Sequence, residues 1–416
     1  MLTRWQWLVR LLGRRMWFRA ALMCAFGGAL ALAGALVGHM ISYRFAATIG
    51  AKSVDGILSI LASSMLAVTT FSLTAMVSAY SGAASTITPR AVQLLIDDST
   101  AQNTLATFLG SFLFAIVGIV ALSTGLYGET GRVILFVGTI VVILVIVITL
   151  LRWIEHLGQF GRVADTIDRV ERAAIAAVDK MLQPVTFAGE EASRTPPGAA
   201  TMTPIEADTM ARLTHVDIAQ LGEIAEAIDA DIYVAALPGN LVEPGRPIAY
   251  VAGRCDDAAA DKVREAFTLA HSRAFDHDPR FGLVVLSEIA SRALSPAVND
   301  PGTAIAVIEA GTRVMLRLVD HRPDHTDMPP RVHLPAVRFG GLLNDLYRPI
   351  GRDGAAVVEV GIRLQKALGA LARHCPAARP CIKDEALDAL ARAAITMESD
   401  ADRDGLTEAH KAALSI

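Results

Sequence analysis

The chain has 416 residues, a formal net charge of −4 and 53% hydrophobic residues. Its length exceeds that of one ordinary domain. Because the net charge is slightly acidic, there is no electrostatic basis for binding nucleic acid, and nucleic acid is not an expected partner. The hydrophobic residues are concentrated in the first third of the chain. This distribution predicts a polytopic membrane protein with a large, more polar C-terminal region.

Four long uncharged runs lie before Arg152. Each supplies the ~20 apolar residues that a helix needs to cross a hydrocarbon core of ~30 Å. We predict a transmembrane domain of four helices over residues 1–151. Its spans are expected at about 20–43, 57–82, 104–127 and 133–151. Membrane lipid is therefore an expected partner.

The basic residues near the first span predict its orientation. Arg44 and Lys52 are the only basic residues in the loop that follows this span, whereas five arginines precede it: Arg4, Arg10, Arg14, Arg15 and Arg19. Since basic residues are retained on the cytoplasmic side, the N-terminus is expected in the cytoplasm. Four crossings return the chain to that side. The predicted location is the bacterial inner (plasma) membrane, multi-pass, with both termini cytoplasmic and the first helix uncleaved.

The second apolar run carries hydroxyl side chains at helical spacing, and residues 56–89 contain no charged side chain. At ~100° per residue the hydroxyls fall within an arc of roughly 100°. The members are Ser59, Ser63, Thr70, Thr74, Ser78, Ser81, Ser85 and Thr88. We call this set the hydroxyl stripe. Small hydroxylated residues favour close packing of membrane helices, but a helix lining a wet path has the same pattern.

The region after the fourth span divides by composition. An amphipathic connecting helix is predicted at 152–187, either continuing the fourth span as one rod or packing as a separate helix. A linker rich in proline and small residues follows at 188–203. We predict a cytoplasmic mixed α+β domain at 204–416, with a β-rich unit at about 204–255 and a helical part at about 256–416.

Local patterns within this domain predict its elements. Strands are expected at 231–236 and 247–252, with a turn at Pro238-Gly239-Asn240. Asp300 and Pro301 are typical of a helix cap and a first helical position. Helices are expected over 216–228, 258–274, 281–294, 301–318, 339–347 and 355–374, and from Glu385 onward.

The string FGLVVLSEIASRALSPAVNDPGTA at 281–304 resembles the signature of an uncharacterised bacterial family of predicted membrane proteins, domain of unknown function 2254. The Ser/Thr-rich second span and the PGNLVEPGRPIAYV segment at 238–251 resemble the same family. The resemblance implies four membrane helices and a cytoplasmic tail, without an established activity. The positions that match its motif are Ser295, Asn299, Asp300, Pro301 and Thr303. Two interpretations apply to this motif, namely a rigid capped turn and a small polar pocket at a helix N-terminus.

Chemical motifs are sparse elsewhere. There is no nucleophile elbow, HExxH pair or phosphate loop, so we expect no catalytic residues and no enzyme. Asp400, Asp402 and Asp404 open a calcium-type loop, but Lys411 occupies its twelfth position, which favours a solvated, frayed C-terminus instead. Histidine and aspartate clusters near 271–278 and 320–333 are interpreted as polar loops. No metal and no cofactor are expected.

The sequence therefore predicts a homo-oligomeric channel or conduit for ions or small solutes. The hydroxyl stripe is expected to line the path, and the cytoplasmic domain is expected to gate it. The alternative is a non-conducting membrane-anchored sensor or scaffold whose cytoplasmic domain binds a ligand or partner.

Overall fold

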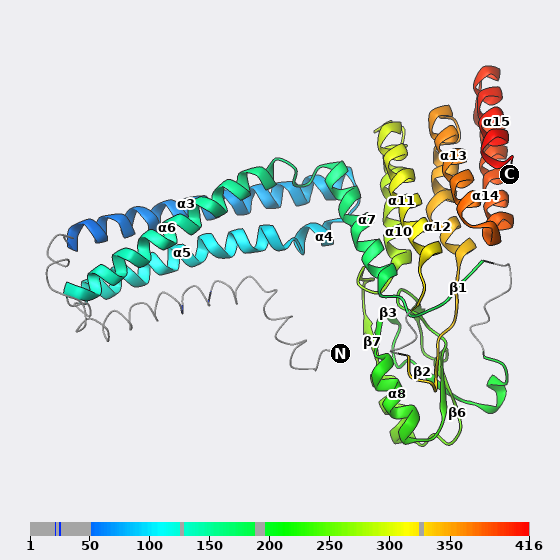
Figure 1. Ribbon diagram of the computed structural model, residues 1–416, viewed down its shortest axis with the longest axis horizontal. Coiled ribbons are helices and arrows are strands. Elements are labelled where there is room, and N and C mark those ends of the chain that lie inside the picture. The colour runs from blue at the N-terminus through cyan, green and yellow to red at the C-terminus, as the bar shows by residue number, and fades with distance from the viewer. Residues whose placement is uncertain are drawn as a thin grey trace. The chain divides into compact units, whose positions relative to one another are not determined.

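A computed structural model describes the chain at positions 21 and 25 and over residues 51–124, 129–187, 196–323 and 328–415. The first predicted span, at 20–43, lies outside the described residues apart from those two positions. The chain divides into two compact units (Figure 1). The apolar-helix unit comprises described residues 51–85 and 92–162, and the C-terminal unit comprises 86–91 and 163–415.

The apolar-helix unit consists of helices α3 (Ala51–Thr86), α4 (Val92–Ile96), α5 (Ser99–Ser123) and α6 (Glu129–Leu157). Within the described residues, three stretches are long and apolar enough to cross a membrane: Val54–Ser85, Val92–Ser123 and Arg132–Leu157. They contain the second and fourth predicted spans and most of the third. Asp98 fixes the start of α5, because its carboxylate accepts a hydrogen bond from the Ala101 backbone N–H at 2.7 Å.

One face of α3 packs against both other long helices. Leu58 on this face is fully buried, and a Cβ added to Gly118 of α5 would lie 3.0 Å from its Cδ1 atom. From α6, the buried Trp153 Nε1 donates to Ser72 Oγ of α3 at 3.0 Å. The α3 face that carries Leu58 and Ser72 is therefore the inner face of this unit.

The connecting region is a separate helix rather than a continuation of α6. The chain turns after Leu157, and Gly161 in this turn has a left-handed φ of 77°. Helix α7 (Val163–Asp179) then begins in the C-terminal unit. A Cβ added to Gly282 of α10 would lie 2.4 Å from the Ala174 Cβ of α7, so the two helices pack closely.

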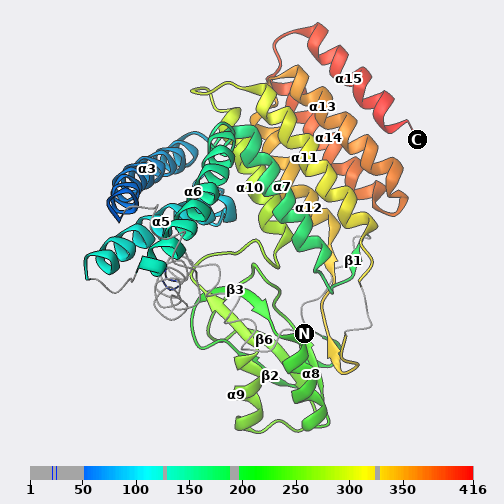
Figure 2. The same cartoon turned by 60° about the vertical axis from the view of Figure 1, so that its left-hand side comes forward.

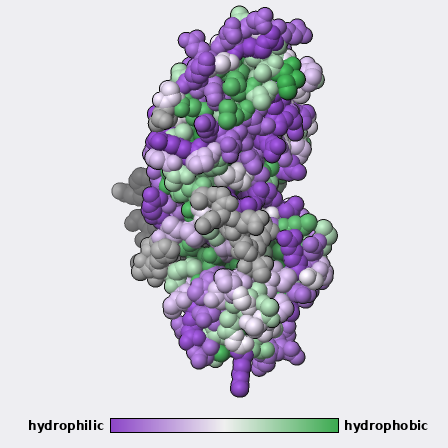
Figure 3. Space-filling model, turned by 90° about the vertical axis from the view of Figure 1, so that its right-hand side faces the viewer, coloured by the Kyte–Doolittle hydropathy of each residue, from purple (hydrophilic) through white to green (hydrophobic). Residues whose placement is uncertain are grey.

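The helical part of the C-terminal unit is an array in which α7 and six further helices lie side by side (Figures 1 and 2). These are α10 (Pro279–Ala293), α11 (Pro301–Asp320), α12 (Phe339–Asp353), α13 (Val358–His374), α14 (Arg379–Thr396) and α15 (Asp400–Leu414). A short 3-10 helix, η4 (Pro376–Ala378), precedes α14. The expected fraying of the C-terminus is wrong, because Ser399 caps α15 and Leu406 is buried, although many other side chains of α15 are exposed. The array face shown in Figure 3 is mainly hydrophilic.

The described residues of the β-rich part of the C-terminal unit form three small sheets, as expected for a mixed α and β region. Their strands are β1 (Val185–Thr186), β2 (Thr203–Glu206), β3 (Ala211–Val216), β4 (Asp231–Val234), β5 (Leu241–Val242), β6 (Pro247–Ala252), β7 (Phe267–Ala270), β8 (Val332–His333) and β9 (Val337–Arg338). The strand orders are β2-β6-β4-β8, β5-β3-β7 and β1-β9. Helices α8 (Ile218–Ala227) and α9 (Asp257–Glu265) and the 3-10 helix η2 (Ala199–Thr201) complete this part.

Two features of the β-rich part depend on pairings distant in sequence. The helix predicted over 258–274 is wrong beyond Glu265, because Phe267–Ala270 forms β7 and pairs antiparallel with β3. Strand β8 returns from beyond α11 and pairs parallel with β4, placing Val332 opposite Ile232. Both residues lie in the apolar core that also contains Leu221 of α8.

Candidate functional site

The hydroxyl stripe lies on the exposed face of α3. Among the described residues, its members Ser59, Ser63, Thr70, Thr74, Ser78, Ser81 and Ser85 are all exposed. At ~100° per residue, their mean direction lies roughly 150° from that of the buried Leu58, Met65 and Met76. The stripe therefore faces away from α5 and α6.

Several stripe hydroxyls bond to the backbone of their own helix. Ser63 Oγ donates to the Ser59 carbonyl at 3.0 Å, and Thr70 Oγ1 donates to the Leu66 carbonyl at 2.9 Å. Thr74 Oγ1 donates to the Thr70 carbonyl at 3.0 Å. These bonds use the hydroxyl protons, whereas the oxygen lone pairs remain able to accept hydrogen bonds from water or a solute.

Thr88, the last predicted member, differs from the others because it is buried in the C-terminal unit. Its Oγ1 donates to Glu288 Oε2 of α10 at 3.1 Å, and Arg90 forms an ion pair with the same carboxylate. This ion pair raises the pKa of Arg90. Ile87 and Ala91 on either side are also buried. The segment that continues α3 is thus anchored to α10.

The motif at 295–303 forms a capped turn between α10 and α11. Asp300 accepts hydrogen bonds from the Thr303 N–H at 3.1 Å and the Thr303 hydroxyl at 2.6 Å, and these bonds hold its pKa below the usual value. Pro301 occupies the first turn of α11, and Asn299 has a left-handed φ of 48°. Ser295 Oγ donates to the Arg292 carbonyl at 2.7 Å. These groups bond to neighbouring backbone and side chains, and Asn299 and Asp300 are exposed.

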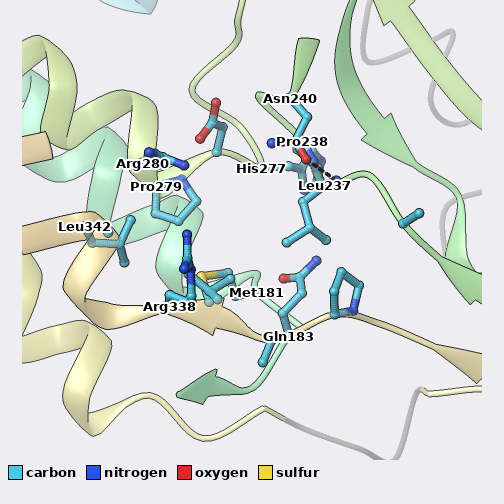
Figure 4. A pocket seen from close by; sticks show the side chains of 16 residues that line it. Met181, Gln183, Leu237, Pro238, Asn240, His277, Pro279, Arg280, Arg338 and Leu342 are labelled. Atoms are coloured by element: carbon cyan, nitrogen blue, oxygen red, sulfur yellow. Dashed lines mark hydrogen bonds between the residues drawn. The ribbon is translucent and has the colours of Figure 1, made fainter. Parts of the chain in front are cut away.

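The structure also contains a cavity that the sequence did not predict. It has a volume of about 150 Å³ and lies within the C-terminal unit, where the β-rich part meets the helical array (Figure 4). Four segments line it: the chain after α7, the turn at 235–240, the loop at 277–280 that enters α10, and the segment at 335–342 that enters α12.

The Pro238-Gly239-Asn240 turn forms one wall of this cavity. The Leu237 N–H donates to Asn240 Oδ1 at 3.0 Å, as drawn in Figure 4. Gly239 has a left-handed φ of 90°, and a Cβ there would lie 2.1 Å from Asp278 Oδ2. Only glycine therefore fits both this conformation and this close approach.

A buried ion pair supports the wall beside α10. Asp278 is 3% exposed and caps α10 by accepting from the Phe281 N–H at 3.0 Å. Arg273 donates to its Oδ2 from Nε at 2.8 Å and lies over the Phe281 ring, 4.9 Å from the centroid. Burial raises the pKa of Asp278, and Arg273 opposes this shift. The sequence signal was an Asp-Pro pair at 278–279, which repeats the capping pair at 300–301.

Positive charge predominates around the cavity. Arg280 is paired with Asp345, and its Nη2 lies 3.1 Å from Oδ1. Arg338 is exposed, and no carboxylate within the described parts of the chain forms an ion pair with it. The His277 ring lies 4.7 Å from the His215 ring, centroid to centroid. Burial, His215 and Lys180 lower the pKa of His277.

The other polar clusters considered in the sequence do not form a ligand group for a metal. Over the described ranges, no three His, Cys, Asp or Glu side chains gather as such a group. Members of the second cluster have separate partners: His374 bonds to Asp320 at 2.7 Å, and His321 bonds to the Met181 carbonyl at 2.8 Å. Asp400 and Asp402 lie in the first turn of α15.

Comparison with known proteins identifies the family. The model described as Predicted membrane protein (DUF2254) matches residues 13–370. The chain belongs to this family. The chain is thus a predicted membrane protein of unknown function. The segment at 281–304 that resembles the DUF2254 signature forms most of α10, the capped turn and the start of α11.

Two curated relatives of this DUF2254 member are also uncharacterised. They are the uncharacterized proteins Rv1290c of Mycobacterium tuberculosis (strain ATCC 25618 / H37Rv) and Mb1321c of Mycobacterium bovis (strain ATCC BAA-935 / AF2122/97). Each is 29% identical over 140 residues, which is 32% of this chain and 27% of the relative. The match thus spans about a quarter of the relatives' length. No solved structure matches this chain.

Proposed function

We propose that this protein forms a homo-oligomeric conduit for ions or small solutes in the bacterial inner membrane. The hydroxyl stripes of several copies surround the path, and both termini are cytoplasmic. This role is transport rather than catalysis. The observation that carries the proposal is the exposure of seven hydroxyl side chains along the face of α3 opposite its buried face.

The composition of the exposed α3 surface supports this arrangement. Large apolar side chains border the stripe: Ile60 is 70% exposed, Phe71 is 67% exposed and Val77 is 56% exposed. Such a surface is polar along one strip and apolar on both sides of it. Apolar borders suit contacts with lipid or with a neighbouring helix, and the strip provides hydrogen-bonding oxygens toward an axis.

The anchored segment after α3 supports control by the C-terminal unit. Thr88 and Arg90 both bind Glu288, which lies on α10. Because this segment is covalently continuous with α3, a shift of α10 would move the inner end of the proposed lining helix. We therefore assign the C-terminal unit the role of gate.

Flux through liposomes that contain the purified full-length protein tests the proposal. We expect ion or solute flux from the native protein and a severalfold lower flux when Thr74 and Ser78 are both changed to leucine. Val77→Leu is the control, since it introduces the same side chain at an exposed position beside the stripe without removing a hydroxyl. Absence of flux from well-folded protein would reject the conduit.

Accessibility of the stripe provides a second test. In a background without the native cysteines, single cysteines over residues 59–88 are treated with a water-soluble thiol reagent. A wet lining predicts modification only at the seven exposed stripe positions, since Thr88 is buried. Uniform protection contradicts a wet path and favours a covered stripe, with the first predicted span or a second copy as the covering element.

A further inference from the structure

Arg338 is held on a rigid base at the rim of the cavity. The preceding residue, Val337, donates its N–H to the Pro184 carbonyl at 2.8 Å. The following residue, Phe339, is fully buried and packs against Phe187, with 5.4 Å between the ring centroids. Figure 4 shows the Arg338 side chain extending toward Pro279. A guanidinium on such a fixed backbone is well suited to bind a planar or tetrahedral anion.

The charge balance at the cavity favours an anion over a cation. Asp278 is already bonded to Arg273 and to the Phe281 N–H, and Asp345 is already bonded to Arg280. The carboxylates nearest the cavity are therefore neutralised by arginines, whereas Arg338 has no such partner among the described residues. A bound carboxylate or phosphate would neutralise this remaining positive charge.

The rest of the cavity surface suits an apolar group attached to the anion. Leu237, Pro279 and Leu342 line it together with the polar Gln183 and Asn240. A ligand site of this kind combines apolar walls with a few polar groups that set orientation. Gly341 also lines the cavity, and a Cβ added there would have no atom within 4 Å.

From these observations we infer that the cavity binds a small organic anion. Its carboxylate or phosphate lies at Arg338, and its apolar part lies against Leu237, Pro279 and Leu342. This inference goes beyond the proposed conduit, because binding in the C-terminal unit is measured without any flux.

Binding of model anions to the full-length protein in detergent tests this site. The probes are phenyl phosphate and benzoate, with inorganic phosphate as the anion without an apolar part. Benzyl alcohol and benzylamine serve as the neutral and cationic analogues. We expect saturable binding of phenyl phosphate, benzoate or both by isothermal titration calorimetry. The two arms separate phosphate from carboxylate recognition.

Two matched pairs of variants locate the binding. Arg338→Ala should weaken binding of the anion roughly tenfold or more, as loss of a charge-assisted hydrogen bond predicts. Arg254→Ala removes an exposed arginine outside the cavity lining and should leave affinity unchanged. Gly341→Leu should fill the cavity and abolish binding. Gly405→Leu is its control, because Gly405 is also helical with no atom within 4 Å of an added Cβ.

Three results would each overturn the inference. The first is equal affinity in Arg338→Ala and native protein. The second is binding of benzylamine or benzyl alcohol as tight as that of the anions. The third is no saturable binding of any anion to protein that remains folded by circular dichroism. A folded protein that binds anions but shows no flux would reject the conduit and leave this site intact.

Discussion

Buried threonines in the two units form different sets of hydrogen bonds, although the apolar-helix unit also has a polar bond between helices, that of Trp153 to Ser72. In the apolar-helix unit, Thr70 and the buried Thr139 bond to carbonyls of their own helix four residues earlier. In the C-terminal unit, Thr312 makes the same kind of bond to the Ile308 carbonyl and also joins Tyr347 of another helix, with 2.8 Å between the two hydroxyl oxygens. A hydroxyl that bonds only to its own helix does not determine which element packs against that helix face. A hydrogen bond between two helices does help to determine how they pack.

The largest effect should come from breaking the buried ion pair of the C-terminal unit. Arg273→Ala leaves the carboxylate of Asp278 buried without its cationic partner, and we expect a loss of about 3–5 kcal/mol of stability. Hydrogen exchange at α10 amides, which Asp278 caps, would report the loss locally. Arg254→Ala, which removes an exposed arginine, should have no measurable effect. Equal protection of the α10 amides in the two variants would show that the Arg273–Asp278 pair does not stabilise the C-terminal unit.

A smaller loss of stability is expected when either partner of the Thr312–Tyr347 hydrogen bond is replaced, and the loss should differ between the two partners. Thr312→Val leaves the fully buried Tyr347 hydroxyl without a partner, at a cost of about 1–3 kcal/mol. Tyr347→Phe should cost only about 1 kcal/mol, because the Thr312 hydroxyl still donates to the Ile308 carbonyl at 2.6 Å. Urea unfolding of the two variants would measure the difference. The reverse order would show that the aromatic ring packing, rather than the hydroxyl pair, sets the cost.

Elements with local signals were predictable from the sequence. Apolar runs identified α3, α5 and α6, because transfer into a membrane depends on the composition of each segment alone. Asp300 and Pro301 marked the start of α11, because capping acts within one turn. Strand β7 was missed, since the segment Phe267–Ala270 has a helix-compatible pattern and becomes a strand only by pairing with β3.

The cavity was also beyond sequence reasoning. Its lining comes from segments that extend from Met181 to Leu342 in the chain. None of these segments carries a binding motif of its own. The Gly239 turn was predicted, but its approach to Asp278 is a tertiary contact. The orientation of the hydroxyl stripe relative to α5 and α6 likewise required their packing against α3.

Acidification should weaken the C-terminal unit more than the apolar-helix unit. Burial lowers the pKa of His215 and of His277, and their rings face each other. Lys180 further disfavours protonated His277, whereas Asp217 near His215 and Asp276 near His277 oppose the shifts. The histidines therefore bind protons more readily in the unfolded chain than in the folded protein. Their contribution to stability is fully present above the unfolded histidine pKa of about 6.5 and is lost as the pH falls below it.

Thermal unfolding between pH 7.5 and 5.5 would measure this dependence. The double variant His215→Asn and His277→Asn should flatten the slope at unchanged ionic strength. An unchanged slope in that variant would exclude the histidine pair as its source. Exchange of amides in α5 serves as the internal reference and should vary less across the same range.

The smallest effect is expected on the hydroxyl stripe itself. Thr70→Val and Thr74→Val each remove a hydrogen bond to the same helix at an exposed position, so each should change stability by no more than about 0.5 kcal/mol. Unfolding of the full-length protein in detergent and in lipid nanodiscs would measure this change, with Thr312→Val as the comparison. A loss in nanodiscs as large as that of Thr312→Val would mean that the stripe bonds to another helix in the membrane. That result would favour close packing over a water-filled path. In a water-filled path, water can bond to the groups that the removed hydroxyl leaves without a partner.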